Sequence, residues 1–423
     1  MFKFKDYDFD TKTFIANFYY EDKNGVEYNE SIHFAKNRPY DSSLDEILDL
    51  ALKLCFLLIG TSYYKAHPTK EVEVGMLLDE FTANFLNAVY NEGLSQFAFE
   101  NKLKRSDLAK FPVHMPTCNS AVELPYEPGG IIALQSGGKD SILTATLLNE
   151  ARKDWTALYI GSTTTHPAVI DDLDAPVHQI LRLIDTEALN SAANFPDYKN
   201  GHVPVTYILM SLSLVQAILD RKSIIITSIG HEGEEPHSII KDADAGDLAV
   251  NHQWSKTYAA EKLFAEYVHR YICKDIKVGS FLRKYSELKI AEIFADKCWK
   301  RYGRQFSSCN VANYRQKNNN AELTWCGDCA KCANSYLIFA PFIKPRELKA
   351  VFGGKDLFAD PALADTFRGL LGIGKFEKPF ECVGEINELR QAYSMRKRTY
   401  KKLPFDVPKA VDFDYNDTYE SAF

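Results

Sequence analysis

The first stretch whose residue types could do chemistry is SGGKDS, which directly follows an apolar run. The run Ile131–Leu134 is short and begins with two β-branched residues, as expected of a buried parallel strand, and helical spacing resumes at Ile142. A strand-to-helix loop exposes backbone N–H groups at a positive helix end, and glycines let an anion approach them. The stretch therefore predicts a phosphate-binding loop, the SGGKDS loop, made of Ser136, Gly137, Gly138, Lys139, Asp140 and Ser141.

This loop lacks the two most familiar nucleotide-binding signatures. A Walker A loop needs Gly at position 133 and Ser or Thr after Gly-Lys, but the chain has Ala133 and Asp140 there. The dinucleotide pattern G-x-G-x-x-G is also missing. The alternative is an ordinary turn before a capped helix. The convergence of two glycines, two serines and an aspartate directly after a buried strand favours a ligand-binding loop.

Four cysteines near residue 320 have the spacing of a metal site. The C-x₂-C-x₂-C run and one cysteine that precedes it with sixteen residues between them can supply four thiolates to a tetrahedral zinc ion, which would close the coordination sphere of a structural site. An iron–sulfur cluster and ordinary buried thiols are the alternatives. The predicted zinc ligands are Cys309, Cys326, Cys329 and Cys332. Cys55, Cys273 and Cys298 are expected to pack in the core. Cys118 and Cys382 lie in loop-like sequence, where we expect surface or packing roles, with a reactive thiol as the alternative.

A third group of polar residues follows the predicted strands further along the chain. The sequence has NGHVPVT from Asn200, HEGEEP from His231 and NHQWSK from Asn251. No second histidine completes an H-E-x-x-H zinc motif. Capping of a helix by Asn251 and Ser255 is the structural alternative. Because ligands bind at the carboxyl ends of parallel strands, we expect acid, base or carboxylate-binding roles for His202, Glu232, His252 and Lys256.

The elements that must position these residues form an α/β arrangement. Strands are predicted at Ile131–Gln135, Trp155–Ile160 and Ser223–Ser228, with helical stretches between them, which is the pattern of a Rossmann-like parallel sheet. Before them, alternating aromatic runs flank an Asn24-Gly25 turn and predict a hairpin, and helical periods fill Leu44 to Leu103. A proline-rich stretch at 111–130 predicts a linker.

Composition narrows the functional class. The chain has 423 residues and a net charge of −7, which argues against a duplex nucleic-acid binder, although the basic stretch at 396–402 is a local exception. Neither a membrane span nor a signal peptide is expected, and the cysteine usage fits a reducing, cytoplasmic compartment. The aromatic hairpin and the segment FAPF offer surface for a homodimer, although composition does not decide oligomeric state.

The SGGKDS loop resembles that of the pyrophosphate-loop (PP-loop) ATPases, a family with a Rossmann-like fold of the HUP type. The resemblance implies that the loop grips the β,γ-pyrophosphate of ATP, with Lys139 assisting and Asp140 holding Mg²⁺. It also implies four segments: an α+β accessory domain at 1–120, the ATP pyrophosphatase domain at 121–300, the four-cysteine zinc segment at 301–345, and a helix and tail at 346–423.

A closer resemblance rests on motifs spread along most of the chain. SYYKA at 62–66, SGGKDS, NGHVPVT, NHQWSK, WCGDCAKC with FAPF, and KPFECVGEINELR together resemble the ATP-dependent UDP-N-acetylmuramoyl-L-alanyl-L-glutamate epimerases over about residues 1–395. In that family an Asn-Glu pair is expected after the third strand, where this chain has His231-Glu232.

This second resemblance implies a reaction in peptidoglycan precursor synthesis. The terminal L-glutamate of a nucleotide-sugar dipeptide would be inverted to D-glutamate, with ATP converted to AMP and pyrophosphate. An adenylated carboxylate makes the neighbouring Cα–H acidic enough for a base to remove. A PP-loop enzyme that adenylates a nucleobase or tRNA, similar to 7-cyano-7-deazaguanine synthase, and an ATP-sensing scaffold are the alternatives.

Overall fold

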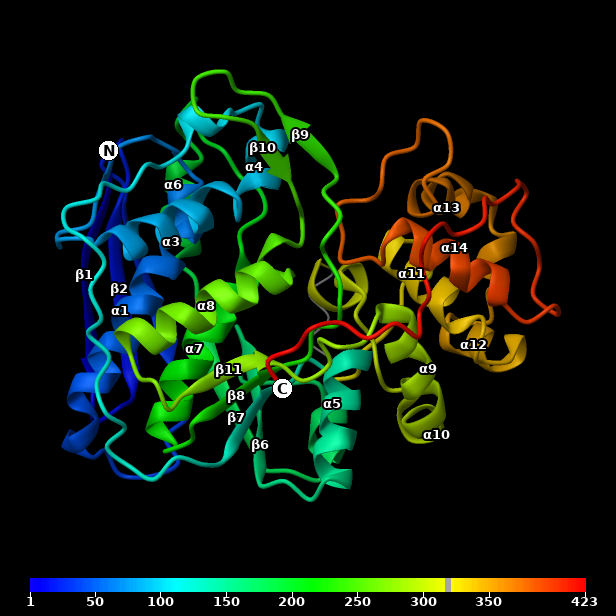
Figure 1. The fold of residues 1–423 in the computed structure, drawn as a ribbon, viewed down its shortest axis with the longest axis horizontal. Helices are drawn as coiled ribbons and strands as arrows, with labels where there is room; N and C mark the ends of the chain where they lie inside the picture. Colours follow the sequence, from blue (N-terminus) through cyan, green and yellow to red (C-terminus); the bar gives the residue numbers. More distant parts are fainter. Residues whose placement is uncertain (316–320) are drawn as a thin grey trace.

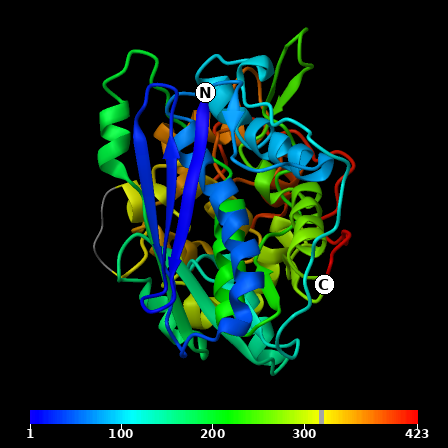
Figure 2. The same ribbon diagram turned by 90° about the vertical axis from the view of Figure 1, so that its left-hand side faces the viewer.

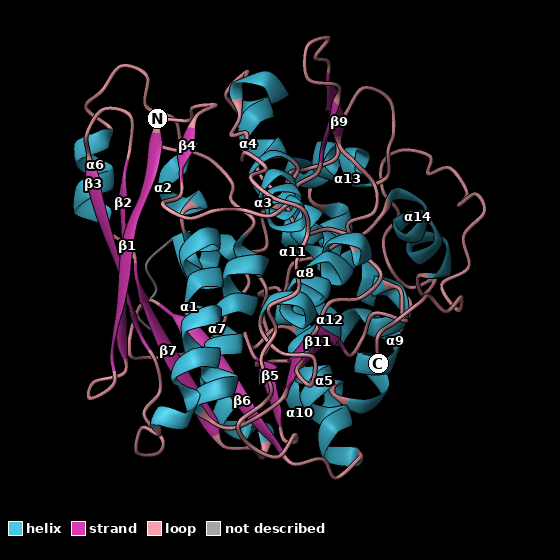
Figure 3. Ribbon diagram, turned by 60° about the vertical axis from the view of Figure 1, so that its left-hand side comes forward, coloured by secondary structure: helices cyan, strands magenta, loops and turns pink. Residues whose placement is uncertain are grey.

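The structure, a computed structural model, describes residues 1–315 and 321–423, and one mixed sheet runs from its outer side, where the N-terminal strands lie, into its interior (Figures 1 and 3). Its nine strands follow the order β11-β8-β5-β6-β7-β3-β2-β1-β4. The strands are β1 (Phe2–Asp10), β2 (Ile15–Glu21), β3 (Glu27–His33), β4 (Val72–Glu73), β5 (Ile131–Leu134), β6 (Trp155–Gly161), β7 (Val177–Leu183), β8 (Ile224–Thr227) and β11 (Lys277–Ser280). A separate two-stranded ribbon pairs β9 (Ser238–Ile240) with β10 (Leu248–Val250).

The run β11-β8-β5-β6-β7 is parallel throughout, which confirms the predicted α/β class. Numbered along the chain, these strands have the order 3-2-1-4-5 of a doubly wound sheet. The order reverses between β5 and β8, which are hydrogen-bonded neighbours. The crevice beyond the carboxyl ends of these two strands is the place where such sheets bind ligands. The three predicted strands are all present, whereas β7 and β11 were not predicted.

The predicted N-terminal hairpin is confirmed, and its turn contains Gly25 at a φ of +79°, which glycine adopts without strain. It is not an isolated ribbon, because β3 pairs antiparallel with β7 and so extends the parallel sheet (Figure 2). The sheet therefore crosses the predicted segment boundary at residue 120. The division into four segments stays a prediction.

Two hydrophobic cores cover the two faces of the sheet. Alternate residues of one strand point to opposite faces, so Ile132 joins the first core and Ile131 the second. Helices on the first face are α1 (Asp45–Ile59), α3 (Glu80–Asn91), α7 (Val205–Leu219) and α8 (Tyr258–Tyr271). Helices on the second face are α5 (Lys139–Glu150), α9 (Glu287–Lys297), α11 (Ala330–Phe339), α13 (Ala364–Leu370) and α14 (Ile386–Met395). In Figure 1 the first group lies to the left of the parallel strands β6, β7, β8 and β11 and the second group to their right, with β1 and β2 at the far left.

The aromatic rings of the hairpin belong to the first core rather than to the surface. Phe18 and Tyr20 are fully buried, and each stacks on Phe56 of α1. In FAPF, Phe339 and Ala340 are likewise buried. Packing within one chain thus accounts for these residues, and a homodimer stays a prediction.

The remaining described helices are short. They are α2 (Thr61–Tyr64), α4 (Ser95–Glu100), α6 (Thr186–Ala192), α10 (Trp299–Tyr302) and α12 (Pro345–Val351). The predicted linker at 111–130 crosses the surface without regular structure before β5. Among the described residues, no helix has the length and apolar character needed to cross a membrane.

Candidate active site

The SGGKDS loop connects the carboxyl end of β5 to the first turn of α5. Gly138 is the N-cap, and the helix begins at Lys139, so the first N–H groups of a twelve-residue helix face the crevice at the sheet edge. The Ser141 hydroxyl donates to the Gly138 carbonyl at 3.2 Å and lies 3.4 Å from the Ser136 amide nitrogen. These contacts hold the loop in a turn whose backbone amides suit an anion.

The two glycines of the loop have different surroundings. Gly137 has a φ of +76°, and a Cβ there would lie 2.5 Å from Cδ1 of Leu323 and 3.0 Å from Cγ1 of Val169. A Cβ on Gly138 would meet nothing closer than the Ser136 hydroxyl at 3.5 Å. Packing therefore requires glycine at position 137, whereas at position 138 the space beside the backbone is left for a ligand.

A buried cluster of charges begins at the first residue of α5. The ammonium of Lys139 contacts a carboxylate oxygen of Asp140 at 2.5 Å and one of Glu287, the first residue of α9, at 2.7 Å. Burial is the largest cause that raises the pKa of Asp140; Lys139 opposes it, Glu287 and Glu232 add to it, and the resulting pKa is about 6. Burial acts to lower the pKa of Lys139, but the two carboxylates outweigh it and the pKa is raised. Lys139 is thus a shared counter-ion of two carboxylates.

A second ion pair lies beyond the carboxyl end of β8. Glu232 is 5% exposed, and its carboxylate is 3.3 Å from the ammonium of Lys256. Burial would lower the pKa of Lys256, but nearby Cys382, Glu232, Glu287 and Asp140 raise it well above the ordinary value. The second pair therefore lies within electrostatic range of the first. Lys256 is therefore charged at neutral pH.

Fully buried Arg283 connects the two segments that carry this pair. Its guanidinium donates to the Gly230 carbonyl at 2.7 Å and to the Lys256 carbonyl at 2.9 Å, and it pairs with Glu261 of α8 at 2.8 Å. The helix α8 is capped by the Thr257 side chain, so the alternative in which Asn251 and Ser255 cap it is wrong. Asn251 instead donates to the Gly233 carbonyl at 2.6 Å and ties the same two segments together.

Two histidines form the third part of the site. The rings of His202 and His252 have centroids 4.5 Å apart, although the residues are fifty positions apart in the sequence. Burial, and then the charges of His252, Lys65 and Lys256, lower the pKa of His202 to about 3. Burial and Lys256 lower the pKa of His252 to about 4. Both rings are therefore neutral near pH 7, and each keeps a ring nitrogen that can accept a hydrogen bond.

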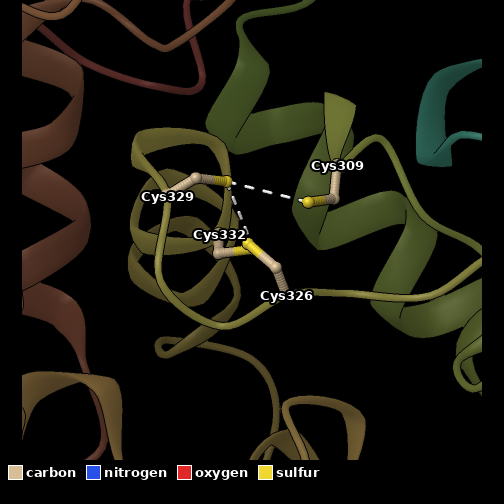
Figure 4. Close-up of side chains that lie close together, drawn as sticks. All are labelled: Cys309, Cys326, Cys329 and Cys332. Carbon is tan, nitrogen blue, oxygen red and sulfur yellow. Dashed lines mark hydrogen bonds between the residues drawn. The ribbon is translucent and has the colours of Figure 1, made fainter. Parts of the chain in front are cut away.

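The four cysteines predicted as metal ligands come together at one side of α11 (Figure 4). All four sulfurs lie within 4.8 Å of one another, and three pairs are 3.5 to 3.7 Å apart. Sulfurs at about 2.3 Å from a tetrahedral ion are separated by about 3.8 Å, so this group can hold a metal ion. Backbone N–H groups of Ala312, Gly327 and Asp328 point at three of the sulfurs, as expected around thiolates.

This cysteine group and the SGGKDS loop are close neighbours. The amide of Ser307, two residues before Cys309, donates to the Gly137 carbonyl at 3.3 Å. Leu323, three residues before Cys326, packs over Gly137. A metal ion held by the cysteines would thus fix the segments that support the loop.

Two residues that the sequence analysis did not select belong to this region, Gln96 and Glu287. Cys382, expected in a surface or packing role, belongs to it as well. Glu287 follows the N-cap Ser286 and therefore has the sequence pattern of an ordinary acidic first turn. The four residues expected to act on the substrate do come together: Glu232 pairs with Lys256, the two histidine rings adjoin, and Lys256 lies within electrostatic range of both rings and of Asp140. Exposed Cys118, in contrast, contacts Asp79 at the start of α3.

Two family models and several named proteins match most of this chain. Models of the MurL N-terminal domain and the MurL C-terminal domain match residues 1–281 and 305–413. A UDP-N-acetyl-alpha-D-muramoyl-L-alanyl-L-glutamate epimerase from Xanthomonas oryzae pv. oryzae is 33% identical over 82% of this chain and 74% of its own length. Proteins with the same name from a Micromonospora strain and from Salinispora tropica are 31% and 32% identical, over 82% of this chain and 75% and 73% of their own lengths. The chain therefore belongs to the MurL family.

Proposed function

We propose that this protein is an epimerase that inverts the terminal L-glutamate of UDP-N-acetylmuramoyl-L-alanyl-L-glutamate, and that it activates the substrate with ATP. The names of its relatives support the substrate. The observation that carries the ATP dependence is the position of the SGGKDS loop: it lies at the switch point of the sheet, directly beside two ion pairs and two neutral histidines.

The chemistry explains why ATP is needed. A free carboxylate makes its neighbouring Cα–H only weakly acidic, because removal of that proton creates a dianion. Attack of the α-carboxylate on the α-phosphorus of ATP forms an acyl-adenylate and releases pyrophosphate. The Cα proton then leaves to give an enolate, which cationic groups stabilise. A proton returns on the opposite face, and water releases the D-product and AMP.

The site divides these tasks among its parts. The amides and hydroxyls of the SGGKDS loop bind pyrophosphate, in the manner of other helix N-termini. Lys256 balances the charge of the adenylate and of the enolate oxygen. Glu232, His202 and His252 bind the substrate carboxylates or move protons, because the histidines are neutral and Glu232 is next to a cation.

Two metal ions fit the residues present. Asp140 and Glu287 are carboxylates at the mouth of the SGGKDS loop, and oxygen ligands of this kind suit Mg²⁺, which neutralises triphosphate charge. The four cysteines fit Zn²⁺ with a closed coordination sphere and hence a structural role. We infer that zinc stabilises the segments packed on Gly137 and does not contact the substrate.

Exchange of labelled pyrophosphate into ATP tests the activation step by itself. We expect exchange that depends on Mg²⁺ and on UDP-MurNAc-L-Ala-L-Glu. Asp140→Asn should lower the exchange at least a hundredfold. Asp365→Asn, at a side chain that is 68% exposed on α13, serves as the matched control and should leave it unchanged. Exchange that requires a nucleobase or tRNA in place of the dipeptide would refute the proposal and favour a base-modifying enzyme.

A further inference from the structure

A thiol that is not part of the cysteine metal group faces the proposed site. Cys382 is half-buried, and its Sγ lies 3.7 Å from Nε2 of His252. Its backbone is held firmly, because Lys331 donates to its carbonyl and the amide of Gly384 donates to the Asn334 side chain at 3.0 Å. A cysteine that only fills space lies among apolar side chains, whereas the thiol of Cys382 is directed at an imidazole.

The hydrogen bonds around His252 determine which of its nitrogens can receive the thiol proton. The Gln96 amide nitrogen donates to the Glu100 carboxylate at 2.7 Å, so the Gln96 amide oxygen faces the imidazole. That oxygen is 2.5 Å from Nδ1 of His252 and can only accept, so Nδ1 carries the hydrogen. Nε2 therefore has a free lone pair pointing at Cys382. Gln96 is a positioning residue that sets this tautomer.

These contacts form a chain that runs from the Glu100 carboxylate through the Gln96 amide and the His252 imidazole to the Cys382 thiol. It has the logic of an activated nucleophile or base, in which a third group orients the imidazole. Burial is the main cause that lowers the pKa of His252 to about 4, so the ring is neutral and its Nε2 lone pair is open to the thiol hydrogen. The Lys256 ammonium lies within electrostatic range of Cys382, which contributes to the raised pKa of Lys256.

We propose that Cys382 is the catalytic residue that removes or returns the Cα proton on one face of the glutamyl residue, with His252 as its proton partner; this inference rests on the proposed epimerase function. The thiol proton passes to His252, and the thiolate takes the Cα proton as the electron pair moves into the adenylated carbonyl to form an enolate.

The opposite face of Cα is served by a different group. The Lys256 ammonium gives a proton to that face as the enolate collapses, and Cys382 is left as a thiol. Transfer of the imidazolium proton through water to the neutral Lys256 amine restores the starting state, so all protons balance. Two different groups on two faces are what inversion requires.

The decisive variant is Cys382→Ala, studied in D₂O with each epimer of the substrate. We expect substrate-dependent pyrophosphate exchange within about threefold of wild type and inversion lowered by about 10²- to 10⁴-fold. The epimer whose Cα proton faces Lys256 should still take up deuterium without inversion. The epimer whose Cα proton faces position 382 should take up none. The matched control is Cys118→Ala, because the Cys118 thiol is exposed and lies next to the start of α3, outside the proposed site.

Outcomes that overturn the inference differ from those that overturn the function. Inversion by Cys382→Ala within threefold of wild type, or equal loss of deuterium entry into both epimers, excludes Cys382 as a face-specific base. Absence of pyrophosphate exchange in the wild-type protein refutes the activation step instead.

Alkylation of the intact wild-type protein provides a test that does not depend on folding of a variant. With iodoacetamide and peptide mapping, we expect Cys382 to react at least tenfold faster than Cys118, and ATP with substrate to protect Cys382 alone. Gln96→Leu should slow alkylation of Cys382 without changing that of Cys118, and Gln96→Glu should restore it. Equal reactivity of the two thiols, or no protection, contradicts the inference.

Discussion

Alanine substitutions at Gly137 and Gly138 separate backbone strain from ligand access in the SGGKDS loop. At Gly137, alanine must adopt a left-handed conformation, which costs about 1–2 kcal/mol, and its Cβ would overlap Leu323, which costs about 1–3 kcal/mol more. We therefore expect Gly137→Ala to lower the free energy of unfolding by about 2–5 kcal/mol. Gly354→Ala has a similar φ of +84° with nothing within 4 Å, and as the control it should show the strain alone.

Gly138→Ala should behave in the opposite way. Its φ of −83° suits alanine and its Cβ would meet only an ordinary contact, so the loss of stability should stay below about 1 kcal/mol. The methyl group would occupy space that the structure leaves open beside the loop amides. We expect the KM for ATP to rise at least tenfold, which corresponds to about 1.4 kcal/mol of binding.

Denaturant unfolding and steady-state pyrophosphate exchange measure the two effects separately. A Gly138→Ala protein with the wild-type KM for ATP would refute the assignment of the loop as the pyrophosphate site. A Gly137→Ala protein no less stable than Gly354→Ala would refute the packing argument.

Three further predictions concern the surroundings of the site. Cys329→Ser removes one thiolate, so we expect loss of bound metal by elemental analysis, a lower unfolding temperature and a higher KM for ATP; full metal content would contradict this. Burial and then Glu287 raise the pKa of Glu388 to about 8, so the folded state keeps a proton that the unfolded state releases, and stability falls as pH rises from about 4.5 to about 8. Glu388→Gln should flatten that decline, and identical unfolding midpoints of the two proteins across this range would refute the reasoning. The C-terminal segment 414–423 runs back to β11 (Figure 1), and in it the Tyr419 ring stacks on the ring of His231, the neighbour of Glu232, with centroids 3.5 Å apart. Removal of the Tyr419 side chain should lower kcat about tenfold with a small change in unfolding temperature. An unchanged kcat would show that this stacking does not order the site.

The parts of the site that could be predicted are those whose residues are contiguous in the sequence. The SGGKDS loop and the C-x₂-C-x₂-C run carry their spacing in a few residues, so local chemistry is enough to recognise them. His202, Glu232, His252 and Lys256 could be nominated because each lies near the end of a predicted strand or the start of a helix, where a doubly wound sheet binds ligands.

The parts that could not be predicted depend on long-range contacts. Glu287 becomes part of the charge cluster only because α9 packs beside α5 and brings it to Lys139. Cys382 reaches His252 from 130 positions further along the chain, and no local pattern marks that contact. The strand β7 contains His178, Gln179 and Arg182, so its sequence lacks the apolar run of a buried strand, and its pairing with β3 joins residues about 150 positions apart.

A single incubation in D₂O tests the central claim, that inversion at Cα is coupled to adenylation, most directly. Purified protein, Mg·ATP and UDP-MurNAc-L-Ala-L-Glu are combined, and AMP, glutamate chirality after hydrolysis and deuterium at Cα are measured together. We predict AMP and D-glutamate that carries deuterium at Cα, with neither formed when ATP is omitted. D-Glutamate formed without ATP, or AMP formed while the glutamate stays in the L configuration and unlabelled, would contradict the account.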